Sequence, residues 1–152
     1  MKKSLIILLT FLNFAYAESE LKLSNYGIVL SEGGESPTRA QFLSNNEREI
    51  ESWQVSAKID RIPHKPEIEF GISYRVNCPF NQVKESLTMP FYFDPNTISR
   101  FRSIDCEELQ YFSFQLSKNN FWMIQNGSYN FKVELLNDDS IEKSFFIKRS
   151  NF

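Results

Sequence analysis

Apolar and polar residues alternate strictly over residues 67–76. The apolar positions share one phase: Ile68, Phe70, Ile72, Tyr74 and Val76. A period of two is the spacing of a β-strand, and a strand with one apolar and one polar face is typical of an antiparallel sheet. We therefore predict a central strand here, with Glu67 and Glu69 on the face that points to water.

The same alternation recurs in six other segments, which we also predict to be strands: residues 21–30, 53–59, 83–93, 112–116, 129–135 and 141–147. A change of phase at Asn25 and Tyr26 predicts a β-bulge or a change of sheet within the first of them. Two charged residues, Glu85 and Lys143, interrupt the apolar phase of their strands. Residues 97–110 lack the pattern, and we predict that they are irregular.

Turn-forming residues separate these segments. Pro63 and Pro66 turn the chain into the central strand, and Pro90 breaks its strand or keeps it at a sheet edge. Gly127 precedes Tyr129, a position from which a tyrosine hydroxyl often bonds to nearby backbone as a tyrosine corner. Together the segments predict an all-β fold, an immunoglobulin-like antiparallel β-sandwich of about seven strands, with a small barrel as the alternative.

The N-terminus has the organisation of a secretory signal peptide. Lys2 and Lys3 precede a short apolar run, and residues 15–17 (Ala-Tyr-Ala) offer a cleavage site; an uncleaved N-terminal anchor is the alternative. We predict a signal peptide at residues 1–17, a single domain at residues 18–152, and a periplasmic or secreted location. No later apolar run reaches membrane length, so we expect no membrane span after cleavage.

Charge argues against a nucleic-acid partner. Removing residues 1–17 leaves 15 basic and 19 acidic side chains, a net charge of −4. Nucleic-acid binding needs a basic field, and the charges are scattered along the chain without a block of one sign.

The two cysteines, Cys78 and Cys106, are predicted to form a disulfide, because export brings a protein into an oxidising compartment. The bond would close a loop of about 29 residues, which is worth roughly 3.6 kcal/mol in the chain-entropy treatment. A redox or metal-binding pair is the alternative, but the spacing is not CxxC and no cluster of ligands accompanies it.

Three stretches together resemble a bacterial domain family of unknown function, whose members are about as long as this chain without its leader. They are residues 61–63 (Arg-Ile-Pro), residues 70–75 (Phe-Gly-Ile-Ser-Tyr-Arg), and residues 122–131 with 143–147. The resemblance covers most of residues 20–148. The chain departs from the family pattern at Asn126-Gly127, where the family has Pro-Gly, and in its two cysteines. The resemblance implies a small sandwich in a periplasmic setting and carries over no catalytic residue.

Catalytic patterns are weak, and we predict no enzyme activity and no cofactor. The single histidine, His64, lies between two prolines without an orienting partner in the sequence. Glu67 and Glu69 could flank a substrate as a hydrolase pair, but glutamates on a solvated strand face are far commoner. Residues 126–128 (Asn-Gly-Ser) match the glycosylation pattern, which turn chemistry explains better.

Aromatic residues outside the apolar phase are the best candidates for ligand or partner contact. Tyr92, Tyr111 and Phe146 each face away from their apolar neighbours, and Arg100 and Phe101 lie in the segment predicted to be a loop. Such residues can form an exposed patch, although they can also be covered by loops or fill a second sheet face. The leading hypothesis is an exported binding or scaffold module that contacts an envelope protein or a glycan. An envelope hydrolase and a carbohydrate-binding module are the alternatives.

Overall fold

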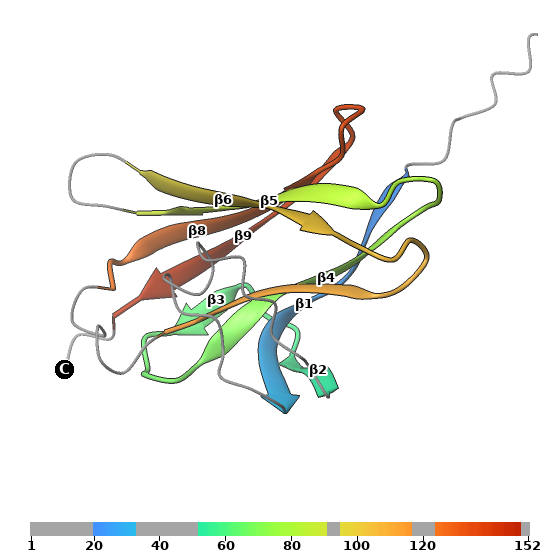
Figure 1. The fold of residues 1–152 in the computed structure, drawn as a ribbon. Coiled ribbons are helices and arrows are strands. Elements are labelled where there is room, and N and C mark those ends of the chain that lie inside the picture. The colour runs from blue at the N-terminus through green and yellow to red at the C-terminus, as the bar shows by residue number, and fades with distance from the viewer. Residues whose placement is uncertain (1–19, 33–51, 91–94, 117–123, 150–152) are drawn as a thin grey trace, which may run out of the picture.

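A computed structural model describes residues 20–32, 52–90, 95–116 and 124–149, and nine strands lie in these ranges. The strands are β1 (Leu21–Glu32), β2 (Ser52–Ala57), β3 (Arg61–Pro63), β4 (Glu69–Val76), β5 (Gln82–Met89), β6 (Asn96–Ser103), β7 (Gln110–Gln115), β8 (Gly127–Glu134) and β9 (Ser140–Lys148). They form two sheets that pack face to face (Figure 1).

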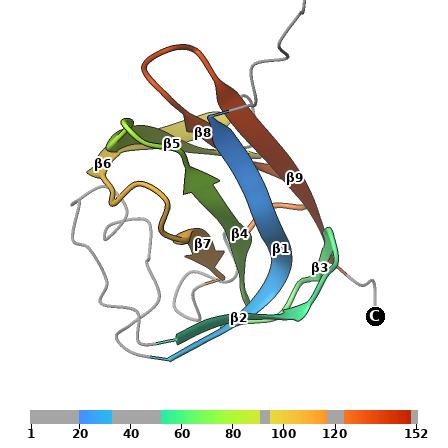
Figure 2. The same ribbon diagram turned by 90° about the vertical axis from the view of Figure 1, so that its right-hand side faces the viewer.

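The sheets have four and five strands, in the orders β2-β1-β4-β7 and β3-β9-β8-β5-β6. All neighbouring strands are antiparallel except β3 and β9, which run parallel. Figure 2 shows β9 and β3 of one sheet beside β1 and β2 of the other. The predicted all-β sandwich is confirmed. The described residues hold two more strands than the alternation indicated, β3 and β6.

The prediction that residues 97–110 are irregular is wrong for strand β6. Its residues alternate, but the inward positions include Arg100 and Arg102, so the apolar signal of a strand is missing. Both arginines are held by a buried glutamate on β5, whose register against β6 runs unbroken from Gln82 to Met89. A strand whose inner face is charged cannot be found from apolar periodicity alone.

Four phenylalanines, two from each sheet, pack together in the core. Phe70 and Phe112 of the four-stranded sheet meet Phe131 and Phe145 of the five-stranded sheet edge to face. Their ring centroids lie 4.8–5.6 Å apart, and all four side chains are fully buried. Complete burial of such a ring contributes about 1.5–3 kcal/mol, and edge-to-face pairing adds to it.

Local predictions in the apolar strands are confirmed. The register of β1 against β4 shifts between Leu23 and Asn25, one residue before the predicted change of phase. The Tyr129 hydroxyl donates a hydrogen bond of 3.1 Å to the backbone oxygen of Gln125, which is the tyrosine corner. Burial raises the pKa of Tyr129 to about 12.

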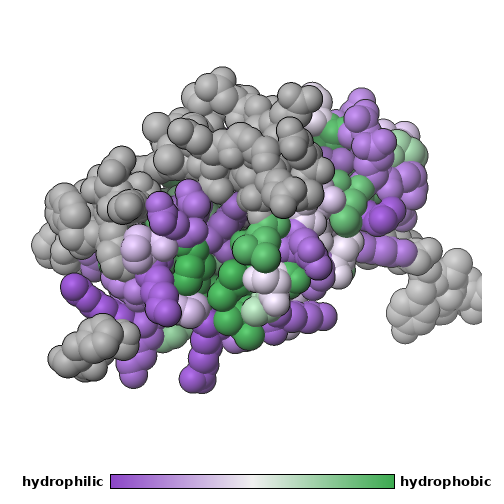
Figure 3. All heavy atoms as spheres, turned by 90° about the horizontal axis from the view of Figure 1, so that it is seen from below, coloured by the Kyte–Doolittle hydropathy of each residue, from purple (hydrophilic) through white to green (hydrophobic). Residues whose placement is uncertain are grey.

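The prediction that the polar face of the central strand points to water holds for Glu67 and Arg75 and is wrong for the residues between them. On β4, Glu69 and Ser73 are both buried. Neighbouring strands approach closely here: Gly27 of β1 and Gly71 of β4 lie opposite each other, and a Cβ on either would collide with the backbone of the next strand. Glu69 also accepts a hydrogen bond from Ser113 of β7. Figure 3, the underside of the molecule as drawn in Figure 1, shows apolar residues gathered among hydrophilic ones.

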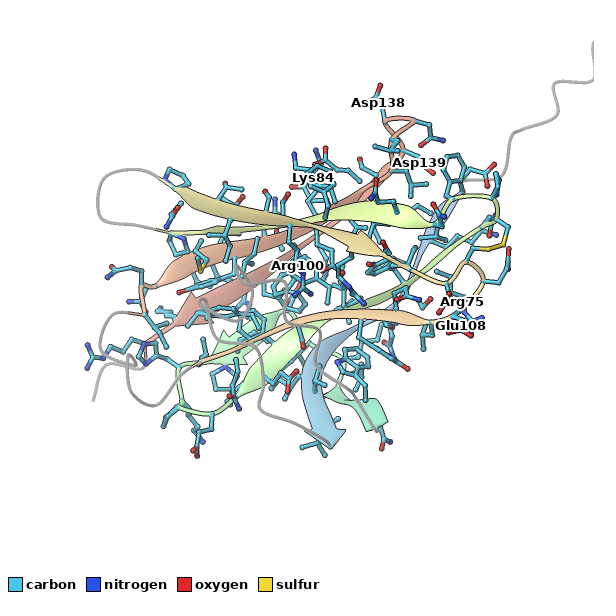
Figure 4. The ribbon with its side chains drawn as sticks, viewed as in Figure 1. Arg75, Lys84, Arg100, Glu108, Asp138 and Asp139 are labelled. Atoms are coloured by element: carbon cyan, nitrogen blue, oxygen red, sulfur yellow. A yellow bond between two sulfur atoms is a disulfide. The ribbon has the colours of Figure 1, made fainter. Side chains whose placement is uncertain are left out.

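Cys78 and Cys106 lie at disulfide distance, with their Cα atoms 5.1 Å apart. Their bond joins the loop after β4 to the loop after β6, at the end of the sandwich where Figure 4 labels Arg75 and Glu108. The predicted signal peptide at residues 1–17 lies outside the described residues. In the described part of the chain, no helix is long and apolar enough to cross a membrane.

Candidate functional site

A groove of about 720 Å³ runs along the outer face of the five-stranded sheet at the β3 edge. We call it the β3–β9 groove. Its lining residues come from β3 with the residue before it, from β8 and from β9: Asp60, Arg61, Ile62, Pro63, Ser128, Ser144, Phe145, Phe146 and Lys148. This volume is in the range of clefts that hold small ligands.

Strand register fixes the geometry of the groove around Phe146. Arg61 of β3 and Ser128 of β8 are the direct neighbours of Phe146 on either side, so the three side chains form one row across the sheet. Ser144 and Lys148 lie two residues before and after Phe146 on β9, and they share its face because successive strand residues alternate. The ring is therefore surrounded by two hydroxyl groups and two cations.

The charges of the groove are unbalanced. Asp60 is engaged by Lys143, whose Nζ lies 3.9 Å from Oδ2 and 3.8 Å from the centre of the Tyr26 ring. Arg61 and Lys148 take part in no ion pair within the described ranges. Two exposed positive charges therefore remain beside Phe146, although the whole chain carries a net charge of −2.

Apart from Phe101 at the far corner, the rest of this sheet face is polar. Hydroxyl pairs link β5 to β6, at 2.9 Å between Ser86 and Ser99 and at 2.8 Å between Thr88 and Thr97. Asn130 of β8 donates a hydrogen bond to Glu142 of β9. Lys84, labelled in Figure 4 on the outer side, pairs with Glu134, which also accepts a hydrogen bond from Lys132. The β3–β9 groove is thus an apolar and basic hollow at the margin of a hydrophilic surface.

The predicted contact aromatics do not form one patch. Phe146 is 48% exposed in the groove, and Phe101 is 58% exposed on β6. Strand register places these two residues about 25 Å apart, at opposite corners of the same face. Tyr111 lies on the other sheet, where its ring stacks on Trp53 at 4.8 Å between centroids. Tyr92 lies outside the described residues.

Arg100, predicted as a loop contact, instead points between the sheets, as Figure 4 shows. Its Nε lies 2.7 Å from Oε2 of Glu85, and Nη1 of Arg102 lies 2.8 Å from Oε1. The Tyr74 hydroxyl donates to the same Oε1 at 2.7 Å. Burial, with the Glu85 carboxylate beside it, raises the pKa of Tyr74 well above its usual range. Because Glu85 is fully buried, we interpret this cluster as structural.

The two glutamates proposed as a hydrolase pair do not face one substrate. Glu69 is buried and accepts a hydrogen bond of 2.5 Å from the Ser113 hydroxyl. Glu67 lies before β4, in the left-handed region with φ of 66°, and is exposed. The ring of His64 has its Nε2 3.4 Å from the backbone oxygen of Ile124. Among the described residues, no group of three or more histidine, cysteine or acidic side chains could hold a metal ion.

No protein-family model matches this chain, and no curated protein matches it. The resemblance to a bacterial domain family of unknown function therefore stays a prediction. Sequence reasoning identified Phe146 but missed Arg61, Ser128, Ser144 and Lys148 as its neighbours. The alternation of β9 already places two of them on the face of Phe146, whereas Arg61 depends on a parallel pairing that no local pattern reveals.

Proposed function

We propose that this protein is an exported, non-catalytic binding module whose ligand occupies the β3–β9 groove. One observation carries the proposal: a half-exposed phenylalanine, Phe146, lies in a groove between two cations, Arg61 and Lys148, that form no ion pair with any described residue. Ligand-binding grooves usually combine an apolar side chain with surrounding polar groups. The apolar side chain supplies affinity, and the polar groups orient the ligand.

Export fits the cysteine chemistry. A disulfide between Cys78 and Cys106 persists in oxidising compartments, which include the periplasm and the extracellular space. The organisation of residues 1–17 agrees with this location. We therefore propose a ligand of the cell envelope or its surroundings.

Of the alternatives, the carbohydrate-binding module is compatible with the groove. The hydrolase alternative is less well supported, because its motivation was a pair of glutamates, Glu67 and Glu69, on one exposed face. Glu69 is instead turned into a buried contact with Ser113. A binding role needs no catalytic pair and draws on residues that are already exposed.

Affinity capture with matched variants tests the proposal. The mature wild-type protein, Phe146→Ser and Phe101→Ser are immobilised separately and exposed to a cell-envelope extract, and bound proteins and glycans are quantified. Both variants remove an exposed phenylalanine from the same sheet face, but only Phe146 lines the groove. We expect Phe146→Ser to lose the bound component and Phe101→Ser to retain it. Equal retention by all three proteins, or no bound component at all, would contradict the proposal.

A further inference from the structure

We infer that the β3–β9 groove binds an anionic glycan, in which sugar rings carry carboxylate groups. The inference rests on the proposed function, because it names the ligand class of the same groove. Three features support it: two cations without an ion-pair partner among the described residues, the exposed ring with its flanking hydroxyls, and the pairing of β9 on both sides.

Charge indicates an anion. Arg61 offers a planar guanidinium that can donate two parallel hydrogen bonds to a carboxylate, and Lys148 offers a compact positive charge on the same face. The acid that lines the groove, Asp60, is already engaged by Lys143. A neutral ligand would leave both cations without an ion-pair partner among the described residues, whereas an anionic ligand would neutralise them.

The uncharged part of the groove indicates a sugar. The apolar face of a sugar ring can pack on the Phe146 ring, which removes apolar surface of both from water. Ser128 lies beside that ring on β8, and Ser144 lies two residues before it on β9. The Ser128 hydroxyl can donate to and accept from the hydroxyl groups of a sugar, and the Ser144 hydroxyl, which donates to Oδ1 of Asn130 at 3.4 Å, can accept from them. An inorganic anion would use the cations but would leave the ring uncovered.

Backbone geometry disfavours an extended peptide. A peptide that adds to a sheet needs free N–H and C=O groups at a strand edge. Strand β9 is paired on both sides, with β3 and with β8, so the groove floor offers side chains only. The edge strand β3 has three residues, and its last residue, Pro63, has no N–H to donate.

Titration calorimetry with three defined probes tests the inference: a galacturonic acid pentasaccharide, the same pentasaccharide with its carboxyl groups reduced to alcohols, and a glutamate pentapeptide. We expect binding of the acidic sugar, at least tenfold weaker binding of its reduced form, and no measurable binding of the peptide. Affinity for the acidic sugar should fall as salt is raised, because exposed charges are screened.

Four variants locate the binding. Arg61→Gln and Lys148→Gln should each weaken binding of the acidic sugar roughly three- to tenfold, and Phe146→Ser by tenfold or more. Lys84→Gln is the matched control, since it removes one positive charge from the same sheet face outside the groove. Its affinity should stay within about twofold of wild type. Thermal unfolding of each variant checks that the fold is retained.

The outcomes separate the two proposals. Equal binding of both sugars that depends on Phe146 would overturn the anionic inference and leave the binding module intact. Binding of the glutamate peptide with the same dependence on Arg61 would replace the glycan with an acidic polypeptide. No binding of either sugar would overturn the glycan inference, while the capture experiment with Phe146→Ser would still decide the proposed function.

Discussion

Glu85→Gln is expected to destabilise the fold strongly, because it removes the buried acid with which both Arg100 and Arg102 pair. Glu85 is fully buried, and the arginine side chains are 10% and 18% exposed. A glutamine can turn its oxygen toward Tyr74 and Arg102, but its NH₂ group then faces the donor Nε of Arg100. At least one charge-assisted hydrogen bond is lost, together with the counter-charge that Glu85 supplies to both cations.

Breaking a buried ion pair by removing one partner costs about 3–5 kcal/mol. We therefore expect Glu85→Gln to lower the free energy of unfolding by about 3 kcal/mol or more. Glu134→Gln is the matched control, because the same substitution removes an acid from the neighbouring strand β8 where its partners Lys84 and Lys132 are partly exposed. It should cost less than about 1 kcal/mol.

Urea unfolding of the oxidised protein at pH 7, followed by circular dichroism, measures both losses. A double-mutant cycle with Tyr74→Phe should also give a coupling energy of about 1 kcal/mol, since the two residues share a hydrogen bond of 2.7 Å. If Glu85→Gln costs no more than Glu134→Gln, the charged cluster does not hold β6 against β5, and the reasoning is wrong.

Three further predictions concern stability. The pKa of Tyr129 is about 12 in the fold and about 10 when unfolded, so the fold binds this proton more tightly and loses stability as pH rises from 10 to 12. Between pH 9 and pH 11, the free energy of unfolding of Tyr129→Phe should therefore fall by about 1.4 kcal/mol less than that of wild type. Equal falls in the two proteins would contradict the raised pKa of Tyr129. Reduction of the Cys78–Cys106 bond should lower the free energy of unfolding by roughly 3.6 kcal/mol, while the double serine variant should not respond to reductant. Gly71→Ala should lower the free energy of unfolding by about 1–3 kcal/mol, since its Cβ would lie 2.3 Å from the backbone oxygen of Phe112, and a urea midpoint no different from wild type would contradict this.

The apolar strands could be predicted from sequence because their inner faces alternate cleanly. The two charged exceptions, Glu85 and Lys143, also face inward in the structure, and each has found a partner. Glu85 meets Arg100, 15 residues later in the chain, and Lys143 reaches the Tyr26 ring in the other sheet. Periodicity shows that such a residue breaks a pattern, but only the packed sheets reveal what compensates the buried charge.

Two failures have a common physical origin. Strand β6 was missed because its inner face is charged, and the outer face of β4 was misjudged because its glycine and serine look solvated in sequence. Gly71 is in fact a site of close approach between β4 and the backbone of β7. Local patterns describe one strand at a time, whereas burial depends on how neighbouring strands and sheets pack.

The candidate site could be predicted only in part. Phe146 was found because an aromatic residue outside the apolar phase of a strand is unusual. The groove around it depends on β3, a strand of three residues that pairs in parallel with β9 across more than 80 positions of sequence. Arg100 was assigned to the surface for the opposite reason, because an arginine in an apparent loop is ordinarily exposed.

Amide chemical-shift mapping is the most direct test of the central claim, that the β3–β9 groove is the ligand-binding surface. An isotope-labelled sample of the mature protein is titrated with the glycan fraction of a cell envelope, and the shifted amides are placed on the fold. The account predicts that the shifts cluster at residues 60–63, at Ser128 and at residues 144–148. Shifts centred on Phe101 or on the Trp53–Tyr111 stack, with the groove unchanged, would contradict it.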